Sequence, residues 1–362
     1  MNSSKTVFTN IGEVPRFPVY ELNDSDWKNG IVVRSPNWLG DAIMTFPALV
    51  QLKKIIPEDK KLIILCPPGL RKLYETMNLV DEVFALSRAH SSWSIDEIKK
   101  LKSFSAGVGL LFNNSPRDVI YFRIAGISRL FGASARCRGI LMTRAFRYPK
   151  RVKGLNHFQH SAKYLSMAYA LGAPDWNGEL PEFTLEKDTL SDGVRRALNS
   201  EKLMVIAGGA AYGPAKRWPA ENYRTVAEYW IGQGGYAVTL GTESEKEIGD
   251  RILQGLPPVN SENLAGKTDL TELMMLLQKA DFCVANDSGT MHLSAALGGR
   301  GLAVYGSTDP TATAPISDKW KILYEQEKCS PCFRRECPLD SYRCLTKITP
   351  EKVIGYISEF TE

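Results

Sequence analysis

Short apolar runs and longer amphipathic segments alternate along most of the chain. The apolar runs are bounded by polar residues or glycine and predict buried parallel strands. They lie at 30–35, 61–66, 80–86, 107–112, 202–207, 236–240, 282–285 and 301–306. Helical periodicity between them predicts helices at 41–54, 155–171, 220–233, 243–256, 270–279 and 350–360. Strands that alternate with helices are typical of α/β architecture.

The alternation occurs twice, and a polar, turn-rich stretch around 178–189 separates the two sets. We therefore predict an α/β chain with two Rossmann-like domains that face a cleft. Residues 1–29 are polar and irregular and are predicted to form an N-terminal extension. The first domain then covers 30–185 and the second covers 186–362, and the last helix could pack on either of them.

The composition is that of an ordinary soluble globular protein, with 44% hydrophobic and 23% charged residues in 362. The amino terminus has no apolar stretch of the secretory kind, and no apolar run approaches the roughly 20 residues of a membrane-spanning helix. The seven cysteines are an odd number, which indicates a reducing compartment. We therefore expect a cytoplasmic protein.

The most informative segment runs from 281 to 298 and reads as a buried strand, a polar turn and a helix of small residues. Such a helix points free N–H groups at the carboxyl edge of the sheet, where open α/β folds bind phosphate. The strand at 301–306 also ends in a polar turn, which strengthens the prediction of a nucleotide or phosphosugar site. The residues of this turn and helix start are Asn286, Asp287, Ser288, Gly289, Thr290, Met291 and His292.

A glycine-rich and basic loop follows the first strand of the second half. Gly208 and Gly209 allow a backbone to approach a ligand closely. Lys216 and Arg217 bring positive charge to a place where a diphosphate could bind. The loop is neither a Walker A motif nor a GxGxxG fingerprint. It is a second candidate for nucleotide binding, and the alternative is a solvated loop with an ordinary basic pair.

Asp41 lies where the loop after the first strand leads into a helix. A carboxylate held at such a junction, at the border of the cleft, can accept a proton from a substrate. The alternative is a structural role, in which Asp41 caps the helix or interacts favourably with its dipole.

Four of the seven cysteines fall within 329–344, in the second domain: Cys329, Cys332, Cys337 and Cys344. Their spacing allows four thiolates to surround one tetrahedral zinc ion, and a reducing compartment favours this over disulfides. Two disulfides, a redox-active CxxC pair and four free thiols are the alternatives. No histidine lies in the cluster, so a structural zinc is expected here rather than a catalytic one.

These segments resemble glycosyltransferase family 9, the ADP-heptose:lipopolysaccharide heptosyltransferases. The resemblance covers most of 30–358 and is most specific at 37–41, at 213–219 and from 286 to 310. The string Gly-Pro-Ala-Lys-Arg-Trp-Pro at 213–219 is most similar to the heptosyltransferase II members. The resemblance implies a GT-B fold, with the acceptor on the first domain and the ADP-sugar on the second. It also implies an inverting, metal-independent transfer of heptose from ADP-L-glycero-D-manno-heptose to the lipopolysaccharide inner core.

The resemblance also implies roles for individual residues. Asp41 takes the place of the general base, and Lys216 that of the lysine that serves the ADP phosphates. The turn at 287–292 falls on the donor site, and Glu245 or Glu247 falls where the family places a ribose-binding carboxylate. Fixed cations and a helix dipole would replace a metal at the diphosphate, so no cofactor is expected for catalysis. Acceptor contacts are expected at Asn37, Trp38, Asn113, Arg136 and Arg138.

The acceptor domain contains a strongly basic segment, 117–153, in which Asp118 is the only acidic residue. Such a run is usually a solvated face, but aromatic residues interleave this one. A lipid-linked, phosphate-bearing glycan at an anionic membrane is a natural partner. Nucleic acid is the rival partner, and no nucleic-acid-binding motif supports it. The basic residues are Arg117, Arg123, Arg129, Arg136, Arg138, Arg144, Arg147, Lys150, Arg151 and Lys153.

We therefore expect an enzyme. It is expected to be a monomer and to lie at the cytoplasmic face of the inner membrane. Two alternatives stay open at this point. One is a family 9 transferase with another donor or acceptor. The other is a nucleotide-sugar-binding protein that has kept the fold without turnover. The presence of both Asp41 and Lys216 argues against the latter.

Overall fold

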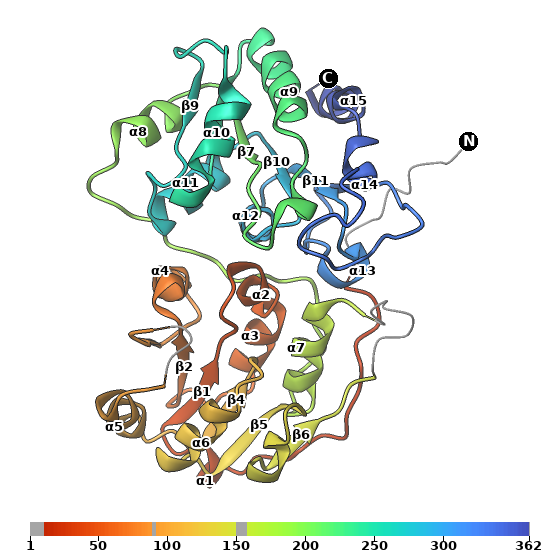
Figure 1. Cartoon of the computed structure of the whole chain (residues 1–362). Helices are drawn as coiled ribbons and strands as arrows, with labels where there is room; N and C mark the ends of the chain where they lie inside the picture. Colours follow the sequence, from red (N-terminus) through yellow and green to blue (C-terminus); the bar gives the residue numbers. More distant parts are fainter. Residues whose placement is uncertain (1–10, 89–91, 150–157, 362) are drawn as a thin grey trace. The chain divides into compact units, whose positions relative to one another are not determined.

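Two compact units make up the chain in the computed structural model, which describes residues 11–88, 92–149 and 158–361 (Figure 1). The described part of the first unit lies within 11–184, and that of the second within 185–361. Each unit contains a six-stranded sheet, and we call the units the first and the second domain.

The first domain is a doubly wound parallel sheet. Its elements are α1 (Asp24–Trp27), β1 (Gly30–Arg34), α2 (Leu39–Ile43), α3 (Phe46–Lys53), β2 (Lys61–Cys66), η1 (Pro68–Leu70), α4 (Arg71–Glu75), β3 (Glu82–Ala85), α5 (Ile95–Ser103), β4 (Val108–Leu111), α6 (Pro116–Ile124), β5 (Arg129–Ala133), η2 (Arg138–Leu141), β6 (Arg144–Phe146) and α7 (His160–Tyr169). The strand order is β3-β2-β1-β4-β5-β6. Every residue of β1 is buried, since helices cover both faces of the sheet. Ile31 pairs with Leu62 on one side and with Val108 on the other.

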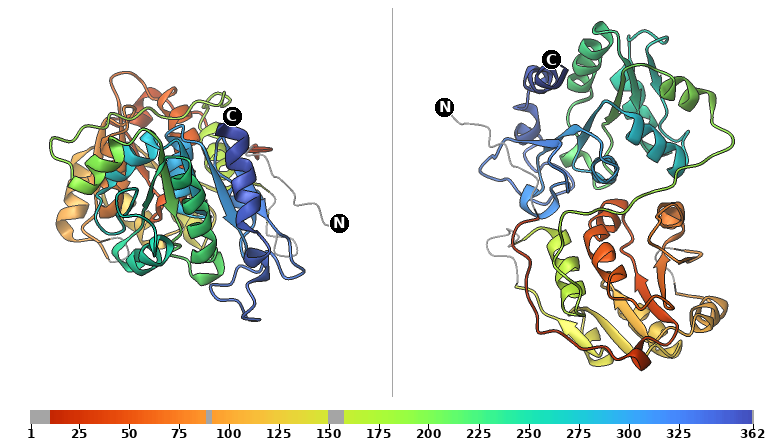
Figure 2. Two further views of the ribbon diagram at one scale, coloured as in Figure 1. Left: turned by 90° about the horizontal axis from the view of Figure 1, so that it is seen from above. Right: turned by 180° about the vertical axis from the view of Figure 1, so that it is seen from behind.

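The second domain repeats this plan. Its elements are α8 (Asp192–Leu198), β7 (Leu203–Ala207), η3 (Pro214–Lys216), α9 (Ala220–Gly232), β8 (Tyr236–Thr239), η4 (Glu243–Glu245), α10 (Lys246–Leu253), β9 (Ser261–Asn263), α11 (Leu270–Lys279), β10 (Phe282–Asn286), α12 (Gly289–Ala296), β11 (Gly301–Tyr305), α13 (Pro310–Thr313), β12 (Trp320–Tyr324), α14 (Arg343–Thr346) and α15 (Pro350–Thr361). The parallel strands run in the order β12-β11-β10-β7-β8-β9. Helices α9, α10 and α15 share a core on one face (Figure 2).

Both sheets have the doubly wound order 3-2-1-4-5-6 when their strands are numbered within each domain. In such a sheet all strands are parallel, but the order in which strands are added reverses between the first and the fourth strand, and ligands bind at the carboxyl ends of those two strands. These switch points lie between β1 and β4 in the first domain and between β7 and β10 in the second. The candidate residues that follow these four strands therefore lie at the edges where a ligand is expected to bind.

Several elements differ from the predicted ones. The helix predicted at 41–54 is two helices, because Pro47 stands in the first turn of α3 and lacks the N–H that a continuous helix would need there. The basic segment expected as a continuous face is instead divided among α6, β5, η2 and β6. Strands β5, β6, β9 and β12 are not among the predicted ones. Strands β6 and β9 have three residues each, and β5 and β12 contain a charged residue, Arg129 and Lys321, that shortens the apolar run.

Residues 11–29, expected as part of an irregular extension, pack on the first domain. The Tyr20 N–H donates to the Ala170 carbonyl at 2.7 Å. The Phe17 ring lies 5.0 Å from that of Phe146, centre to centre. Trp27 at the end of α1 is buried. The few apolar residues in 11–29 are spread without periodicity, and for this reason the segment was expected to be irregular.

The last helix packs on the second domain. Buried residues of α15 join the same hydrophobic core as α9, and the hydroxyls of Tyr229 and Ser358 lie 2.9 Å apart. This resolves the choice that the sequence left open. Among the described residues, no helix combines the length and the apolar character that crossing a membrane requires.

Candidate functional site

Asn286, at the end of β10, holds the loop that follows β7. Its side-chain oxygen accepts hydrogen bonds from the Trp218 N–H at 2.9 Å and from the Tyr223 hydroxyl at 2.8 Å. Its amide nitrogen donates to the Gly208 carbonyl at 2.7 Å. Asn286 is fully buried. A buried amide with these partners fixes the position of its neighbours, so Asn286 shapes the site from beneath.

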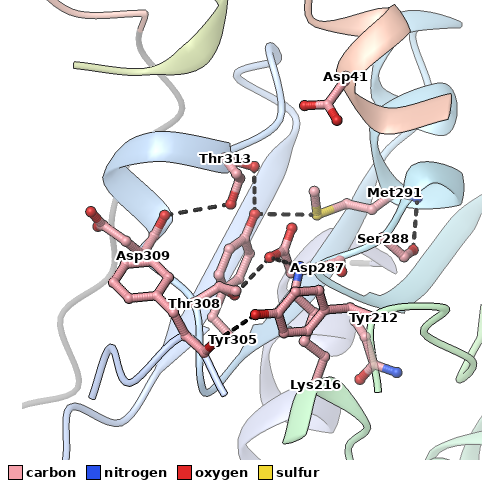
Figure 3. A network of polar contacts seen from close by, with 12 residues as sticks. Asp41, Tyr212, Lys216, Asp287, Ser288, Met291, Tyr305, Thr308, Asp309 and Thr313 are labelled. Carbon is pink, nitrogen blue, oxygen red and sulfur yellow. Dashed lines mark hydrogen bonds and ion pairs between the residues drawn. The ribbon is translucent and has the colours of Figure 1, made fainter. Parts of the chain in front are cut away.

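Lys216 and Asp287 form an ion pair at the switch point of the second domain (Figure 3). The Lys216 Nζ lies 2.6 Å from Asp287 Oδ2, and the Thr308 hydroxyl donates to the same oxygen at 2.6 Å. Burial raises the pKa of the Asp287 carboxyl, but Lys216, the Thr308 hydroxyl and His292 together outweigh burial and hold this pKa below its usual value. The Asp287 carboxyl therefore stays ionised at neutral pH.

The start of α12 adds a helix dipole to this charged pair. Ser288 is the N-cap residue, and its side chain accepts from the Met291 N–H. Gly289 and Thr290 form the first turn and are partly exposed, whereas Met291 and His292 are buried. The N–H groups of a first turn have no partner within the helix and carry partial positive charge. An anion is thus favoured beside Lys216 and this turn.

Gly208 and Gly209 leave no room for side chains at the end of β7. A Cβ on Gly208 would lie 2.5 Å from Ile252 Cδ1, and one on Gly209 would lie 2.2 Å from Glu245 Oε1. Arg217, at the far end of the same loop, donates to the Ala210 carbonyl at 3.2 Å. Gly208 therefore allows the loop to pack against Ile252 of α10, and Gly209 allows it to pass close to the Glu245 carboxylate.

Glu245 lies at the carboxyl edge of the second sheet and is 9% exposed. Its Oε2 accepts from the N–H and the hydroxyl of Thr242, both at 2.9 Å, in a capping box. Glu247 is exposed, two residues further along the chain. Of the two carboxylates that the spacing could not separate, Glu245 is the one beside the glycine loop.

In the first domain, a cavity of about 700 Å³ lies at the switch point between β1 and β4. Asn37, Trp38 and Asp41 line it from the β1 side, and Asn113 from the β4 side. Trp38 is 60% exposed and is the N-cap residue of α2, so Asp41 is not the cap but lies in the first helical turn. The fold thus brings these four predicted residues, together with Arg136, to one cavity.

A buried ion pair that the sequence did not reveal joins the two sides of this cavity. Arg34 Nε donates to Asp118 Oδ2 at 2.8 Å, and the two side chains are 2% and 7% exposed. Arg34 also donates to Asn37 Oδ1 at 2.8 Å, while Asn113 donates to Asp118 at 2.5 Å. Asn37 and Asn113 are therefore held in place by the pair, which fixes the loop leading to Asp41. An arginine inside an apolar strand is the signal that could have found it.

We expect Asp118→Ala to destabilise the first domain by about 3–5 kcal/mol, because it leaves the buried Arg34 charge without its partner. Urea denaturation measures this. The matched control is Asp175→Ala, which breaks the exposed Arg16–Asp175 pair, 59% and 75% exposed, and should cost no more than about 1 kcal/mol. Equal losses in the two variants would contradict a structural role for the buried pair.

The two arginines expected at the acceptor have different positions. Arg136 is exposed and lines the cavity. Arg138 is 3% exposed and is not among the lining residues; it donates to the Ala133 carbonyl at 3.0 Å from Nε and 2.8 Å from a terminal nitrogen. Burial lowers the pKa of Arg138 to about 10. Arg138 therefore supports the loop that presents Arg136 rather than the cavity surface.

Helix α7 contributes cavity residues that the sequence did not suggest. His160, Lys163 and Tyr164 line the cavity, and His160 Nδ1 lies 3.9 Å from Asp41 Oδ1. They come from a helix whose sequence was noted only for its periodicity. Their place in the cavity depends on the packing of α7 against α3, which no local pattern indicates. Of the basic segment, Lys150, Arg151 and Lys153 lie outside the described residues.

The four clustered cysteines do not form a ready ligand set. All are free thiols, Cys329 is exposed, and burial raises the pKa of Cys344, with its three neighbours adding to the effect. Cys337 differs: burial raises its pKa, but N–H groups from 339 to 342 outweigh this and lower it. The described part of the chain contains no group of three or more His, Cys, Asp or Glu side chains that could hold a metal ion. The thiols as placed do not form a tetrahedral zinc site. Zinc binding stays a prediction, which elemental analysis of the purified protein would test.

Comparison with known proteins connects these sites to one family. Residues 98–343 match glycosyltransferase family 9 (heptosyltransferase). Lipooligosaccharide heptosyltransferase 2 of Haemophilus influenzae is 30% identical over 351 residues, covering 91% of this chain and 98% of that protein. Lipopolysaccharide heptosyltransferase 2 of Escherichia coli is 28% identical over 342 residues, covering 90% and 96%.

Solved structures of similar proteins share the fold. Escherichia coli ADP-heptose lipopolysaccharide heptosyltransferase II aligns with a TM-score of 0.74 and 24% identity over 91% of this chain and 98% of that chain. A family 9 glycosyltransferase from Veillonella parvula aligns with a TM-score of 0.75 and 19% identity over 96% and 99%. The predicted α/β class with two Rossmann-like domains, of the GT-B type, is confirmed.

Proposed function

This chain belongs to glycosyltransferase family 9, and we propose that it transfers heptose from ADP-L-glycero-D-manno-heptose to the inner core of lipopolysaccharide. The relatives that it covers almost from end to end carry the name heptosyltransferase 2. Its nearest chemical description is therefore a heptosyltransferase of lipopolysaccharide core synthesis. The observation that carries the proposal is the Lys216–Asp287 pair beside the start of α12, at the switch point where a sugar nucleotide would bind.

On the donor side, we assign Lys216 to the diphosphate. When the bond between the sugar and the phosphate breaks, negative charge grows on the leaving diphosphate. A fixed ammonium and the N-terminal dipole of α12 stabilise that charge without reorganising. Asp287 and Thr308 hold Lys216 in position before the donor arrives. With these fixed positive groups the transfer does not call for a metal ion at the phosphates.

Glu245 is our assignment for the ribose of the donor. A carboxylate at the carboxyl edge of a Rossmann-like sheet can accept hydrogen bonds from ribose hydroxyls. Glu245 is at that edge, with Oε2 engaged by Thr242 and Oε1 directed toward Gly209. Glu247 is exposed and lacks this relation to the glycine loop.

On the acceptor side, Asp41 is the general base. It removes the proton from the acceptor hydroxyl as that oxygen attacks the anomeric carbon. A single displacement of this kind, on the side opposite the leaving diphosphate, inverts the configuration at that carbon. Asp41 lies in the cavity of the first domain beside His160, with Asn37 held by the Arg34–Asp118 pair. Arg136 and Lys163 supply positive charge to the same cavity for an anionic acceptor.

Release of ADP from ADP-heptose, with and without a heptose-deficient core acceptor, tests the proposal. We expect release that depends on the acceptor and that survives EDTA. A strict requirement for Mg²⁺ or Mn²⁺ would contradict the metal-independent mechanism while leaving the transferase assignment in place. Release with another nucleotide sugar alone would favour a family 9 transferase of different specificity. Binding of ADP-heptose without release would favour a non-catalytic protein.

A further inference from the structure

Exposed aliphatic side chains gather on one surface of the first domain. Ile120 and Ile124 on α6 are 44% and 58% exposed, and Ile140 and Leu141 on η2 are 90% and 44% exposed. Single exposed apolar residues are ordinary, but a group of large ones on adjacent elements marks an interaction site. We call these four residues together the α6–η2 face.

Arg123 holds the two elements of this face together. Its Nε donates to the Leu141 carbonyl at 2.7 Å, and a terminal nitrogen donates to the carbonyls of Ile127 at 3.0 Å and Ser128 at 2.6 Å. The arginine thus extends from α6 to the end of η2. Ile120 and Ile124 are separated by one helical turn and lie on the same side of α6. The apolar group is therefore part of a fixed surface.

Positive charge surrounds the α6–η2 face. The segment 116–149 has seven arginines and one carboxylate, a net charge of +6, while the whole chain carries +5. The one carboxylate, Asp118, is buried and paired with Arg34. Arg117 on α6 and Arg136 just before η2 are exposed. The rest of the chain thus has no net positive charge. Within the segment Arg138 is buried and Arg129 pairs with Asp26, so its exposed arginines are Arg117, Arg136 and Arg147.

We propose that the α6–η2 face docks the enzyme on an anionic membrane surface. The four aliphatic side chains would enter the interface between head groups and acyl chains, where binding strength increases with the apolar area that is buried. The arginines would bind lipid phosphates, since the guanidinium group matches a phosphate in a bidentate geometry. Charge complementarity selects an anionic lipid surface over a neutral one.

Docking by this face would also bring the cavity to the substrate. Arg117 and Arg136 line the cavity as well as flanking the face. The cavity of the first domain therefore lies next to the surface that would rest on the lipid. A lipid-linked acceptor could reach it without leaving the membrane. The delivery of a lipid-linked acceptor to the cavity rests on the proposed function. Binding of the face to lipid does not, so the two proposals can fail independently.

Sedimentation of the full chain with vesicles tests the proposal. We expect binding to phosphatidylglycerol vesicles and little binding to phosphatidylcholine vesicles. A variant with Ile120→Ser, Ile124→Ser, Ile140→Ser and Leu141→Ser should lower the partition to phosphatidylglycerol at least about tenfold, because the apolar contribution is lost. ADP release with a soluble, delipidated core acceptor should be unchanged, since none of the four lines the cavity.

The matched control is Val259→Ser, an aliphatic residue that is 79% exposed on the second domain and should leave vesicle binding as it was. The proposal is overturned if the wild-type chain does not sediment with phosphatidylglycerol vesicles, or if the quadruple variant binds them as well as wild type does. It is also overturned if the substitutions only convert a dimer to a monomer, which would make the face a contact between copies of the chain. Binding that short DNA duplexes abolish, with no loss in the quadruple variant, would point to nucleic acid instead.

Discussion

Asp41→Asn is expected to lower turnover by about 10²–10⁴, the range for a lost general base. The amide has nearly the shape of the carboxylate but cannot take the proton of the acceptor hydroxyl. Since Asp41 lies in the cavity of the first domain, affinity for ADP-heptose should change little. Initial rates of ADP release and calorimetric titration with the donor measure the two quantities separately.

The control for this variant is Asp96→Asn, which neutralises a carboxylate that is 93% exposed at the start of α5 in the same domain. It should retain wild-type turnover. The assignment of Asp41 is wrong if Asp41→Asn keeps wild-type turnover, or if it loses donor affinity to the same degree as rate. The second outcome would place Asp41 in donor binding.

Lys216→Met is expected to lower turnover by roughly 10²–10³ and to weaken ADP binding as well. These magnitudes are typical of removing one group that stabilises developing charge. The side chain has similar length and no charge, so the effect isolates the ammonium. The matched control is Lys279→Ala, which removes an exposed lysine at the end of α11 in the same domain and should change neither quantity.

The loss of Lys216 also leaves the buried Asp287 carboxylate without its cation, which costs stability. The double variant Lys216→Met/Asp287→Asn removes both charges and should recover stability, while the Asn oxygen can still accept from Thr308. Turnover should remain low in the double variant, because the cation is still missing. Recovery of turnover together with stability would show that Lys216 serves the fold alone.

The pH dependence of this pair follows from its pKa. The folded state holds the pKa of Asp287 below its usual value of 3.8. The stability that the ionised pair contributes is therefore present above pH 3.8 and is lost as the pH falls through the lower pKa of the folded state. Across the neutral range Asp287 keeps its charge, so a fall in activity near neutral pH would not come from this carboxyl.

The sequence by itself determined the domain plan and most of the candidate residues. Continuous apolar runs such as 282–285 are visible because a strand covered on both faces by helices must be apolar throughout. The polar turn at Asp287 is visible because it interrupts such a run before a helix. The loop with Lys216 is visible in the same way, because glycines and basic residues follow the apolar run of β7. These features depend on neighbours in sequence, which is why local patterns revealed them.

Only the tertiary structure decided which of those residues touch a cavity and which support it. Asn286 and Arg138 looked like ligand contacts, but the side chain of Asn286 binds Trp218 and Gly208 far away in sequence, and Arg138 binds the Ala133 carbonyl. The Arg34–Asp118 pair joins residues 84 apart in sequence, and α7 reaches the cavity from beyond β6. Such contacts depend on the order of the strands in the sheet and on which helices pack against one another. Burial and hydrogen-bond partners arise from that arrangement, and no local pattern of hydrophobic and polar residues carries it.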